Sequence, residues 1–408
     1  MESLLPKRLV IERWQEHATK MTKMRPLHPF SPVVVQFLNE VSALILKNKQ
    51  MRAYPELMAT GYWLRKANII RIQQDFMKRN ENMISLARGV VLHFAPSNVD
   101  TIFLYSWVLS MLAGNLNIVR LSQKRNEQLE VLLEIIGSVM DQDKYEDIKQ
   151  RTLFVTYAHN QQISQFLSGI CHVRVIWGGD QTIRTIRDIP LPPLATELVF
   201  ADRFSTVVLS ADQLIHLEDE QLSKLVHDFY NDAFWFQQMA CSSPRLVCWV
   251  GNDREIEEAK TRFWGEVTAK LQSEQYELPT ALQLTRLTTA FFYGAHTYTD
   301  AVSTALLHTP TRVEVTEINE QIRETHCGGG LFLELSCVSL LQLATFVADK
   351  DQTLSYFGFT KEELKEFIYS LQGRGIDRII PVGKALDFAE IWDGYNLLTY
   401  FTREVDLR

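Results

Sequence analysis

Two spacings of apolar residues alternate along the chain, and they predict its secondary structure. From residue 89 onward, short runs of consecutive apolar residues predict buried strands, and longer apolar or amphipathic stretches between them predict helices. The predicted strands cover 90–94, 117–121, 152–156 and 173–177, with helices at about 99–112 and 126–140. Short strands that alternate with helices predict a parallel α/β sheet with right-handed crossovers.

The segments before and after this α/β region have a different pattern. The first 85 residues look mainly helical and are punctuated by Pro29, Pro32 and Pro55. A boundary is expected near residues 198–210, where a proline-rich stretch has just ended. We therefore predict a first domain over 1–204, a second over 205–365, and a C-terminal extension over 366–408. This extension either returns to the first domain or pairs with another subunit.

Size and composition agree with two globular domains. The chain has 408 residues, which exceeds one ordinary hydrophobic core. Its 46% hydrophobic and 22% charged residues are typical of a soluble enzyme. The net charge of −7, without a long basic run, argues against a nucleic-acid partner. The short basic pair Lys124-Arg125 suits a small anionic ligand instead.

Membrane spans, disulfides and zinc are not expected. The longest apolar stretch, 101–113, has about 13 residues, whereas a bilayer span needs about 20. The N-terminus has neither the apolar region nor the cleavage site of a signal peptide. The five cysteines, at 171, 241, 248, 327 and 337, include no CxxC pair, which argues against a disulfide framework and a zinc site. We expect a cytoplasmic protein without a metal centre.

Cys241 is the leading candidate for catalytic chemistry. It lies between an amphipathic helical stretch at about 222–234 and an apolar strand at 246–250, beside Ser242, Ser243 and Pro244. A thiolate on such a helix-to-strand turn is a strong nucleophile, and a carbonyl or thioester carbon is its natural target. Alternatively, Cys241 is a small buried hydrophobe, as most cysteines without a disulfide are.

Polar and glycine residues follow two of the predicted strands. No GxGxxG dinucleotide fingerprint is present. Asn98, just after the first strand, has a side-chain amide that could donate to a developing oxyanion, or it caps the next helix. Gly178 and Gly179 follow the fourth strand and precede a helix. They allow a ligand to approach the backbone at the helix N-terminus, or they form a plain strand-to-helix turn.

Several acids and histidines are weaker candidates. Glu197 lies beside an apolar strand, where burial would raise its pKa as in a general base; otherwise it is a surface carboxylate. The segment from His326 through Gly328-Gly329-Gly330 could bring His326 or Glu334 to a site. His93 and His172 lie on or beside apolar strands, and we expect hydrogen-bonded core roles for both.

Considered together, these motifs resemble one enzyme family. The resemblance runs from about Tyr54 to the C-terminus and is to the long-chain acyl-CoA reductases, typified by the reductase subunit of the bacterial bioluminescence fatty-acid reductase complex. It is based on His93-Phe94-Ala95-Pro96-Ser97-Asn98-Val99, Ala113-Gly114-Asn115 with Asn117-Ile118-Val119-Arg120, Trp177-Gly178-Gly179-Asp180 and Ala240-Cys241-Ser242-Ser243-Pro244. Downstream it continues with Cys327-Gly328-Gly329-Gly330, the segment 352–359, and the segments 377–388 and 391–395.

The resemblance implies an aldehyde dehydrogenase-like α/β fold, in which two parallel-sheet domains meet at an active-site cleft. The first predicted domain would then be nucleotide-binding and the second catalytic, with an extension used in oligomerisation. Cys241 matches the family's nucleophile, and Asn98 matches the side-chain donor of the oxyanion hole. Glu197 falls at the superfamily's acidic position, but Leu198-Val199-Phe200 replaces the usual Leu-Gly-Gly-Lys after it.

The same resemblance implies a nicotinamide cofactor, and the residues favour NADPH. Gln123 stands where NAD-preferring members often have a glutamate on the adenosine ribose, and the cations Lys124 and Arg125 follow it. A 2′-phosphate would meet these cations without repulsion from an acid. The predicted cofactor-binding residues are Pro96, Ser97, Arg120, Ser122, Gln123, Lys124, Arg125, Gly178, Gly179 and Glu334.

The sequence therefore predicts an NADPH-dependent acyl-CoA reductase that forms an aldehyde through an S-acyl-cysteine. The acyl donor is left open among CoA, a carrier protein and a partner acyl-protein synthetase, and a homo-oligomer is expected. Two alternatives stay open. One is a reductase of an acyl phosphate or a non-lipid acyl group, and the other is a non-catalytic subunit that only accepts acyl groups.

Overall fold

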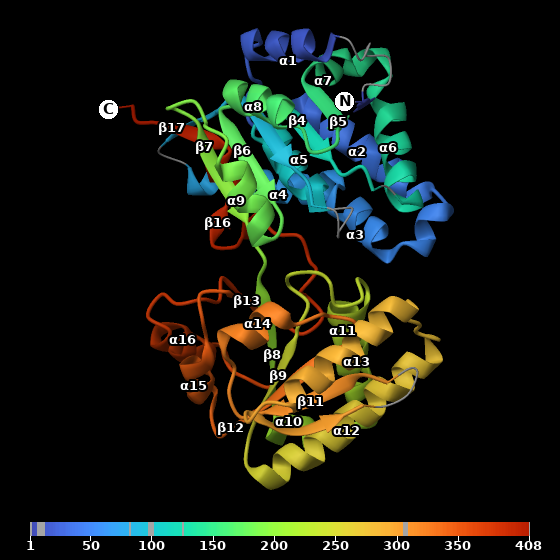
Figure 1. The fold of residues 1–408 in the computed structure, drawn as a ribbon. Helices are drawn as coiled ribbons and strands as arrows, with labels where there is room; N and C mark the ends of the chain where they lie inside the picture. Colours follow the sequence, from blue (N-terminus) through green and yellow to red (C-terminus); the bar gives the residue numbers. More distant parts are fainter. Residues whose placement is uncertain are drawn as a thin grey trace. The chain divides into compact units, whose positions relative to one another are not determined.

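The chain forms two compact units (Figure 1). The computed structural model describes residues 2–5, 13–80, 83–96, 102–124, 126–304 and 309–407. The first unit comprises Met1–Asp202 and Phe388–Arg408, and the second comprises Arg203–Asp387. The boundary between Asp202 and Arg203 lies two residues before the boundary predicted from the sequence, which was between 204 and 205. Each unit is described by itself below.

The first unit contains a doubly wound sheet. Its strand order is β1-β5-β4-β3-β6-β7, in which all pairs are parallel except β1 with β5. The strands are β1 (Glu2–Leu5), β3 (Val90–Phe94), β4 (Leu116–Leu121), β5 (Thr152–Thr156), β6 (Val173–Trp177) and β7 (Thr196–Phe200). The four strands predicted from apolar runs are all present, and the parallel α/β sheet is confirmed. Because β3 is central, the chain winds outward first through β4 and β5 and then through β6 and β7.

Helices cover both faces of this sheet. The helices of the α/β region are α5 (Ile102–Leu112), α6 (Glu127–Met140), α7 (Glu146–Gln150), α8 (Gln161–Ile170) and α9 (Asp180–Arg187). Four N-terminal helices precede them: α1 (Trp14–Lys23), α2 (Pro32–Lys47), α3 (Pro55–Trp63) and α4 (Lys66–Arg79). Helices α1, α8 and α9 share one core with the strands, where Trp14 meets Phe166 edge to face at 5.3 Å.

The apolar helix α5 is buried along nearly its whole length, because α2 covers the side that faces away from the sheet. Phe37 of α2 packs edge-on against Trp107 of α5, with ring centroids 6.3 Å apart, and Trp107 in turn contacts Phe154 of β5. With 11 residues, α5 forms part of a protein core. Within the described ranges, no helix is both long and apolar enough to cross a bilayer.

The last 21 residues return to the first unit. Strand β17 (Thr402–Val405) pairs antiparallel with β2 (Ile84–Ala87), so the red end of the chain lies beside a blue segment in Figure 1. Between residue 388 and β17 lie the short strands β15 (Ile391–Trp392) and β16 (Tyr395–Asn396) and helix α17 (Leu397–Tyr400). Inside the unit, the amide of Asn115 donates to the carbonyl of Phe401 (2.9 Å).

The second unit is built on a seven-stranded sheet in the order β10-β11-β12-β9-β8-β13-β14, parallel except for β10. The strands are β8 (Phe204–Ser210), β9 (Leu246–Val250), β10 (Thr299–Ser303), β11 (Thr311–Val315), β12 (Leu331–Cys337), β13 (Asp351–Phe357) and β14 (Arg378–Pro381). Because β14 pairs with β13, residues 366–387 belong to this second unit. The predicted extension over 366–408 is therefore corrected to 388–408.

Two hydrophobic cores lie on the two faces of this second sheet. One face packs against α10 (Ala211–Ile215), α11 (Asp219–Phe234) and α12 (Asp253–Ser273). The other packs against α13 (Thr280–Gly294), α14 (Glu320–Thr325), α15 (Leu340–Leu343) and α16 (Lys361–Ser370). The N-terminal ends of the parallel strands meet along one edge, so the segments that precede β8, β9, β12 and β13 lie side by side there.

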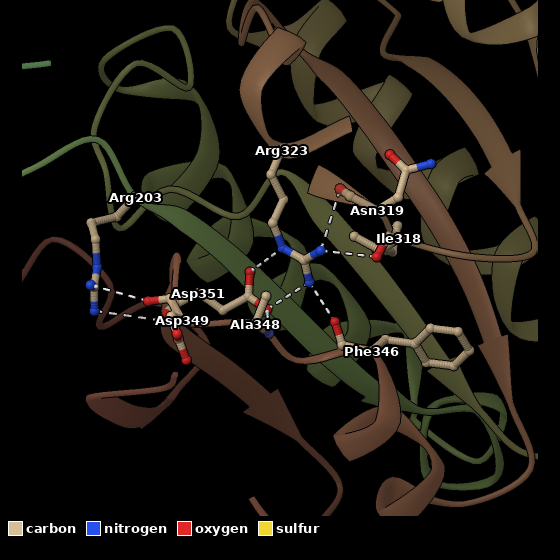
Figure 2. Close-up of polar contacts among 8 residues, drawn as sticks. All are labelled: Arg203, Ile318, Asn319, Arg323, Phe346, Ala348, Asp349 and Asp351. Carbon is tan, nitrogen blue, oxygen red and sulfur yellow. Dashed lines mark hydrogen bonds and ion pairs between the residues drawn. The ribbon is translucent and has the colours of Figure 1, made fainter. Parts of the chain in front are cut away.

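A buried ion pair fastens α14 to the start of β13. Arg323 of α14 donates through two guanidinium nitrogens to the carboxylate of Asp351, both at 2.8 Å, and also to the carbonyls of Ile318 and Phe346. Figure 2 shows Arg203 on the other side of the same segment, where it donates to the backbone carbonyls of Asp349 and Asp351. This network connects the first residue of the second unit to the edge at which β13 begins.

Candidate functional site

Cys241 lies on an irregular loop between α11 and β9, in the second unit. Helix α11 ends at Phe234, and the loop reverses direction through Gln237 and Gln238, whose φ angles of 53° and 62° are left-handed. Cys241 is partly exposed, while its neighbours Ala240 and Ser242 are buried. The thiol therefore lies on a loop that is fixed on both sides of it, as predicted for a helix-to-strand turn.

Hydrogen bonds from within the unit hold this loop. The hydroxyl of Ser205, at the start of β8, donates to the carbonyl of Cys241 itself (2.6 Å). The backbone N–H of Arg245 donates back to the carbonyl of Ser205 (2.8 Å). On the other side, the hydroxyl of Ser243 donates to the carbonyl of Asp232 (2.7 Å). The backbone next to Cys241 is thus anchored to β8 and to α11.

The triple glycine packs directly against the cysteine loop. Gly328, Gly329 and Gly330 have φ angles of 70°, 68° and 76°, a run that side chains rarely allow. The N–H of Gly329 donates to the carbonyl of Gln237 (2.8 Å). A Cβ at Gly328 would lie 3.2 Å from the sulfur of Met239 and from the carbonyl of Gln238. The glycines therefore permit a close approach of two backbone segments.

His326, just before the glycines, is buried. Its Nδ1 accepts the N–H of Gly328 (3.1 Å), and burial lowers the pKa of the ring well below its usual value. The sequence left open whether His326 reaches a site. In the structure it is a neutral residue that shapes the glycine turn. His93, in the first unit, bonds Ser106 and Asn117 through its two ring nitrogens, and burial lowers its pKa to about 4, which agrees with the expected core role.

Asp232 is a buried acid that sequence reasoning missed. Its two carboxylate oxygens accept the N–H groups of Gly383 (2.7 Å) and Ala385 (2.9 Å). Burial raises the pKa of Asp232 to about 7, although these two hydrogen bonds act in the opposite direction. One signal in the sequence could have revealed it: Asp232 lies on the apolar face of α11, beside Phe229 and Ala233.

The other thiols are less suited to nucleophilic chemistry. Cys171, Cys248 and Cys337 are buried, and Cys327 is partly buried. Burial raises the pKa of Cys171 to about 12 and also raises that of Cys327, which keeps both protonated at neutral pH. Cys241 is partly exposed on the hydrogen-bonded loop between α11 and β9, which makes it the best candidate nucleophile among the five cysteines.

Most predicted cofactor residues of the first unit lie on one edge of its sheet. Pro96 follows β3, and Gly178 and Gly179 follow β6. The segment from Arg120 to Lys124 comprises the end of β4 and the residues directly after it. From β3 the chain continues to β4 on one side, and from β5 it crosses back to β6 on the other side of β3. The edge at β3 and β6 is therefore a topological switch point, the place at which α/β sheets bind ligands. The predicted residues Ser97, Asn98 and Arg125 lie outside the described residues.

The side chains along this edge fit an anionic ligand. Arg120 is half-buried and donates to the carbonyl of Tyr157 (3.2 Å), with its guanidinium 5.4 Å from the centre of the Tyr157 ring. Lys124 is exposed. A Cβ at Gly179 would meet no atom within 4 Å, so internal packing does not explain this glycine. Gly179 also caps the N-terminus of α9, an end that favours negative charge.

Glu197 has a different role from the predicted general base. On β7 it is the register partner of Arg174 on β6, and its carboxylate accepts from the buried Arg174 (2.7 Å) and from Arg187 of α9 (2.9 Å). It is the second residue of its strand, so it lies away from the edge that carries Pro96 and Gly178. Because two guanidinium groups already bind its carboxylate, we replace the predicted role of Glu197 as a general base with that of a partner in a structural ion pair.

Glu334 belongs to the second unit, whereas the other predicted cofactor residues belong to the first. It is buried in the middle of β12, in the second unit. One carboxylate oxygen accepts the indole N–H groups of Trp249 (2.9 Å) and Trp264 (2.8 Å), and the other lies 3.5 Å from Arg312. Burial raises the pKa of Glu334. Since its oxygens are already engaged inside the core, we correct the cofactor prediction for this residue.

The fold is that of the aldehyde dehydrogenases. The chain resembles aldehyde dehydrogenase 21 from Physcomitrella patens in complex with succinate, with a TM-score of 0.70, 11% identity, and coverage of 97% of this chain and 89% of that one. It also resembles 1-pyrroline-5-carboxylate dehydrogenase from Thermus with bound NAD, with a TM-score of 0.67, 11% identity, and coverage of 96% and 83%. At these identities the similarity shows the fold alone.

The family follows from the sequence itself. The family model of the acyl-CoA reductases (LuxC) matches residues 69–404, which is most of the chain, and this protein belongs to that family. No curated protein matches the chain significantly. The resemblance inferred from the sequence is thereby confirmed. Family and fold together support an oxidoreductase that reduces an acyl group to an aldehyde.

Proposed function

We propose that the protein reduces an activated long-chain acyl group, donated as acyl-CoA, to the free aldehyde with NADPH, through an S-acyl intermediate on Cys241. The observation that carries this proposal is the position of Cys241. It is a partly exposed thiol on a loop whose backbone is hydrogen-bonded on both sides. A fixed loop presents the sulfur in one orientation, which favours attack on a bound acyl carbon.

In the first half-reaction, the Cys241 thiolate attacks the thioester carbon of acyl-CoA and forms a tetrahedral oxyanion. Collapse of this oxyanion breaks the carbon–sulfur bond to CoA and leaves the S-acyl enzyme. The released CoA thiolate takes a proton from solvent. The backbone N–H of Cys241 is a natural donor to the tetrahedral oxyanion, and the bond from Ser205 to the Cys241 carbonyl restrains the same residue. Asn98, the second predicted donor, remains a prediction.

A nicotinamide nucleotide, when bound, supplies the hydride that reduces the acyl group. The residues at the switch point of the first sheet fit such a group, because an exposed lysine and an unobstructed glycine follow β4 and β6, the two strands that flank β3. Lys124 would hold the 2′-phosphate of NADPH, and Gln123 adds no acid that would repel it. Arg120, oriented by Tyr157, would face the nucleotide as a fixed cation.

The test is acylation without nucleotide. Incubation with a long-chain acyl-CoA should give one acyl adduct, which peptide mass spectrometry maps to Cys241. Cys241→Ala should abolish both the adduct and NADPH oxidation. Cys171→Ala is the matched control, since Cys171 is buried in the first unit, and it should retain both. An adduct on another cysteine would exclude Cys241 as the nucleophile.

The same experiment separates the alternatives. An adduct from an acyl phosphate but not from acyl-CoA would indicate the other donor class. An adduct that no nucleotide turns over would indicate an acyl-accepting subunit. The expected homo-oligomer and the acyl-protein synthetase partner remain predictions, to be tested by the mass of the purified protein and by acyl transfer from such a synthetase.

A further inference from the structure

Three residues before Cys241, the side chain of Gln238 is fully buried and bonded through its whole amide. Its Nε2 donates to the carbonyls of Pro244 (2.8 Å) and Leu331 (2.9 Å). Its Oε1 accepts the N–H of Gly330 (2.9 Å). An amide has two donor hydrogens on nitrogen and an acceptor oxygen, so two carbonyls and one N–H satisfy it in this orientation only.

These bonds connect three pieces of backbone around the nucleophile. Gln238 precedes Cys241 and Pro244 follows it, so the bond to Pro244 closes the loop across the cysteine. The bonds to Gly330 and Leu331 reach the segment that enters β12. Since β12 and β9 are parallel neighbours, this segment lies beside the loop that enters β9. The amide thus joins both ends of the cysteine loop to the adjacent strand.

The glycine turn also bonds to the same loop through its backbone. Beside the side-chain bonds, the N–H of Gly329 donates to the carbonyl of Gln237. A Cβ at Gly329 would lie 3.0 Å from Leu282 of α13, and one at Gly330 would lie 3.4 Å from Phe234. Two successive left-handed non-glycine residues, Gln237 and Gln238, are a strained conformation that surrounding contacts must maintain. The amide of Gln238 supplies those contacts.

We propose that Gln238 is a positioning residue for acyl transfer. It does not touch the substrate; it holds the loop so that the thiol and the backbone N–H of Cys241 keep the geometry required for attack and for oxyanion binding. This inference rests on the proposed function, in which Cys241 is the nucleophile. Gln238 would then act on the rate of acylation rather than on the intrinsic reactivity of the thiol.

Gln238→Met tests this, because methionine has a similar length and no amide. The control is Gln342→Met, which removes a glutamine bond to the N–H of Val338 (2.8 Å) beyond the opposite end of β12. Three quantities are measured for each protein below its melting temperature: the single-turnover rate of Cys241 acylation by a long-chain acyl-CoA, the rate of alkylation by iodoacetamide, and the melting temperature itself.

For Gln238→Met, acylation should slow by about 10²-fold, the typical effect of a reacting group misplaced by about 1 Å. Alkylation, which needs no oxyanion hole, should stay close to the wild-type rate, and Gln342→Met should leave both rates unchanged. A lower melting temperature with wild-type acylation would overturn the proposal, because Gln238 would then only stabilise the fold. Equal losses in acylation and alkylation would also overturn it.

Failure of the proposed function gives a distinguishable result. If the wild type is not acylated at all, acyl-CoA reduction through Cys241 is refuted, and the loop is examined directly by amide hydrogen exchange. Gly329 and Gly330 donate to Gln237 and to Gln238, so their amides should exchange faster in Gln238→Met than in the wild type. Equal protection would refute the positioning role as well.

Discussion

Replacing Asp232 with asparagine should remove a pH dependence of stability that the wild type carries. Asp232 is 2% exposed and bonds two backbone N–H groups, those of Gly383 and Ala385. Burial, helped by the nearby carboxylates of Asp387 and Asp228, raises its pKa from an ordinary 3.8 to about 7. The folded protein therefore keeps a proton on Asp232 in a pH range where the unfolded chain has released it.

The sign and size follow from proton linkage. Because the folded state binds more protons between about pH 4 and pH 7, its free energy of unfolding falls as pH rises through that window. The stabilisation is fully present below the unfolded pKa and is lost as pH passes the folded pKa near 7. A shift of about three pH units corresponds to roughly 4 kcal/mol, a large fraction of typical protein stability.

An asparagine side chain cannot titrate, so Asp232→Asn should lack this slope. The amide oxygen accepts only one of the two N–H groups, and the variant should be less stable than wild type at pH 5. Between pH 5 and pH 8 the difference in stability should narrow by about 3 kcal/mol, because only the part of the titration window above pH 5 is then crossed. Denaturant unfolding at pH 5, 6, 7 and 8 measures it. Asp219→Asn, at a fully exposed site of the same helix, is the control and should parallel wild type. Parallel profiles for Asp232→Asn would refute the reasoning.

Two further predictions concern ion pairing and cofactor choice. Arg323→Met should destabilise the protein by about 3–5 kcal/mol in denaturant unfolding, because Asp351 would stay buried without its cation. Arg187→Met, at an exposed pair, should cost less than about 1 kcal/mol, and equal effects would contradict the burial argument. Neutralising Lys124 and Arg125 together should lower kcat/KM for NADPH by about tenfold, the loss of one charge-assisted bond, with little change for NADH. Equal use of both nucleotides by wild type would refute the 2′-phosphate site.

Local patterns in the sequence were sufficient to predict the four inner strands of the first sheet, and they made Cys241 the leading candidate nucleophile. Runs of apolar residues identify buried strands because a parallel strand is covered on both faces, and the strands at 90–94 and 173–177 are buried throughout. Cys241 was predicted to be the nucleophile because its neighbours form a helix-to-strand turn. The order of motifs along the chain then indicated the family, which needs no knowledge of contacts.

The roles of Gln238, Asp232, Glu197 and Glu334 were decided only by tertiary structure. Each depends on which strands and turns become neighbours, and sheet order does not follow chain order. Gln238 bonds to Leu331 because β12 lies beside β9, and Glu197 meets Arg174 because β7 lies beside β6. A carboxylate at the end of a strand and one at its middle look alike in sequence. What separates a ligand-facing acid from a core ion pair is the partner brought to it by the fold.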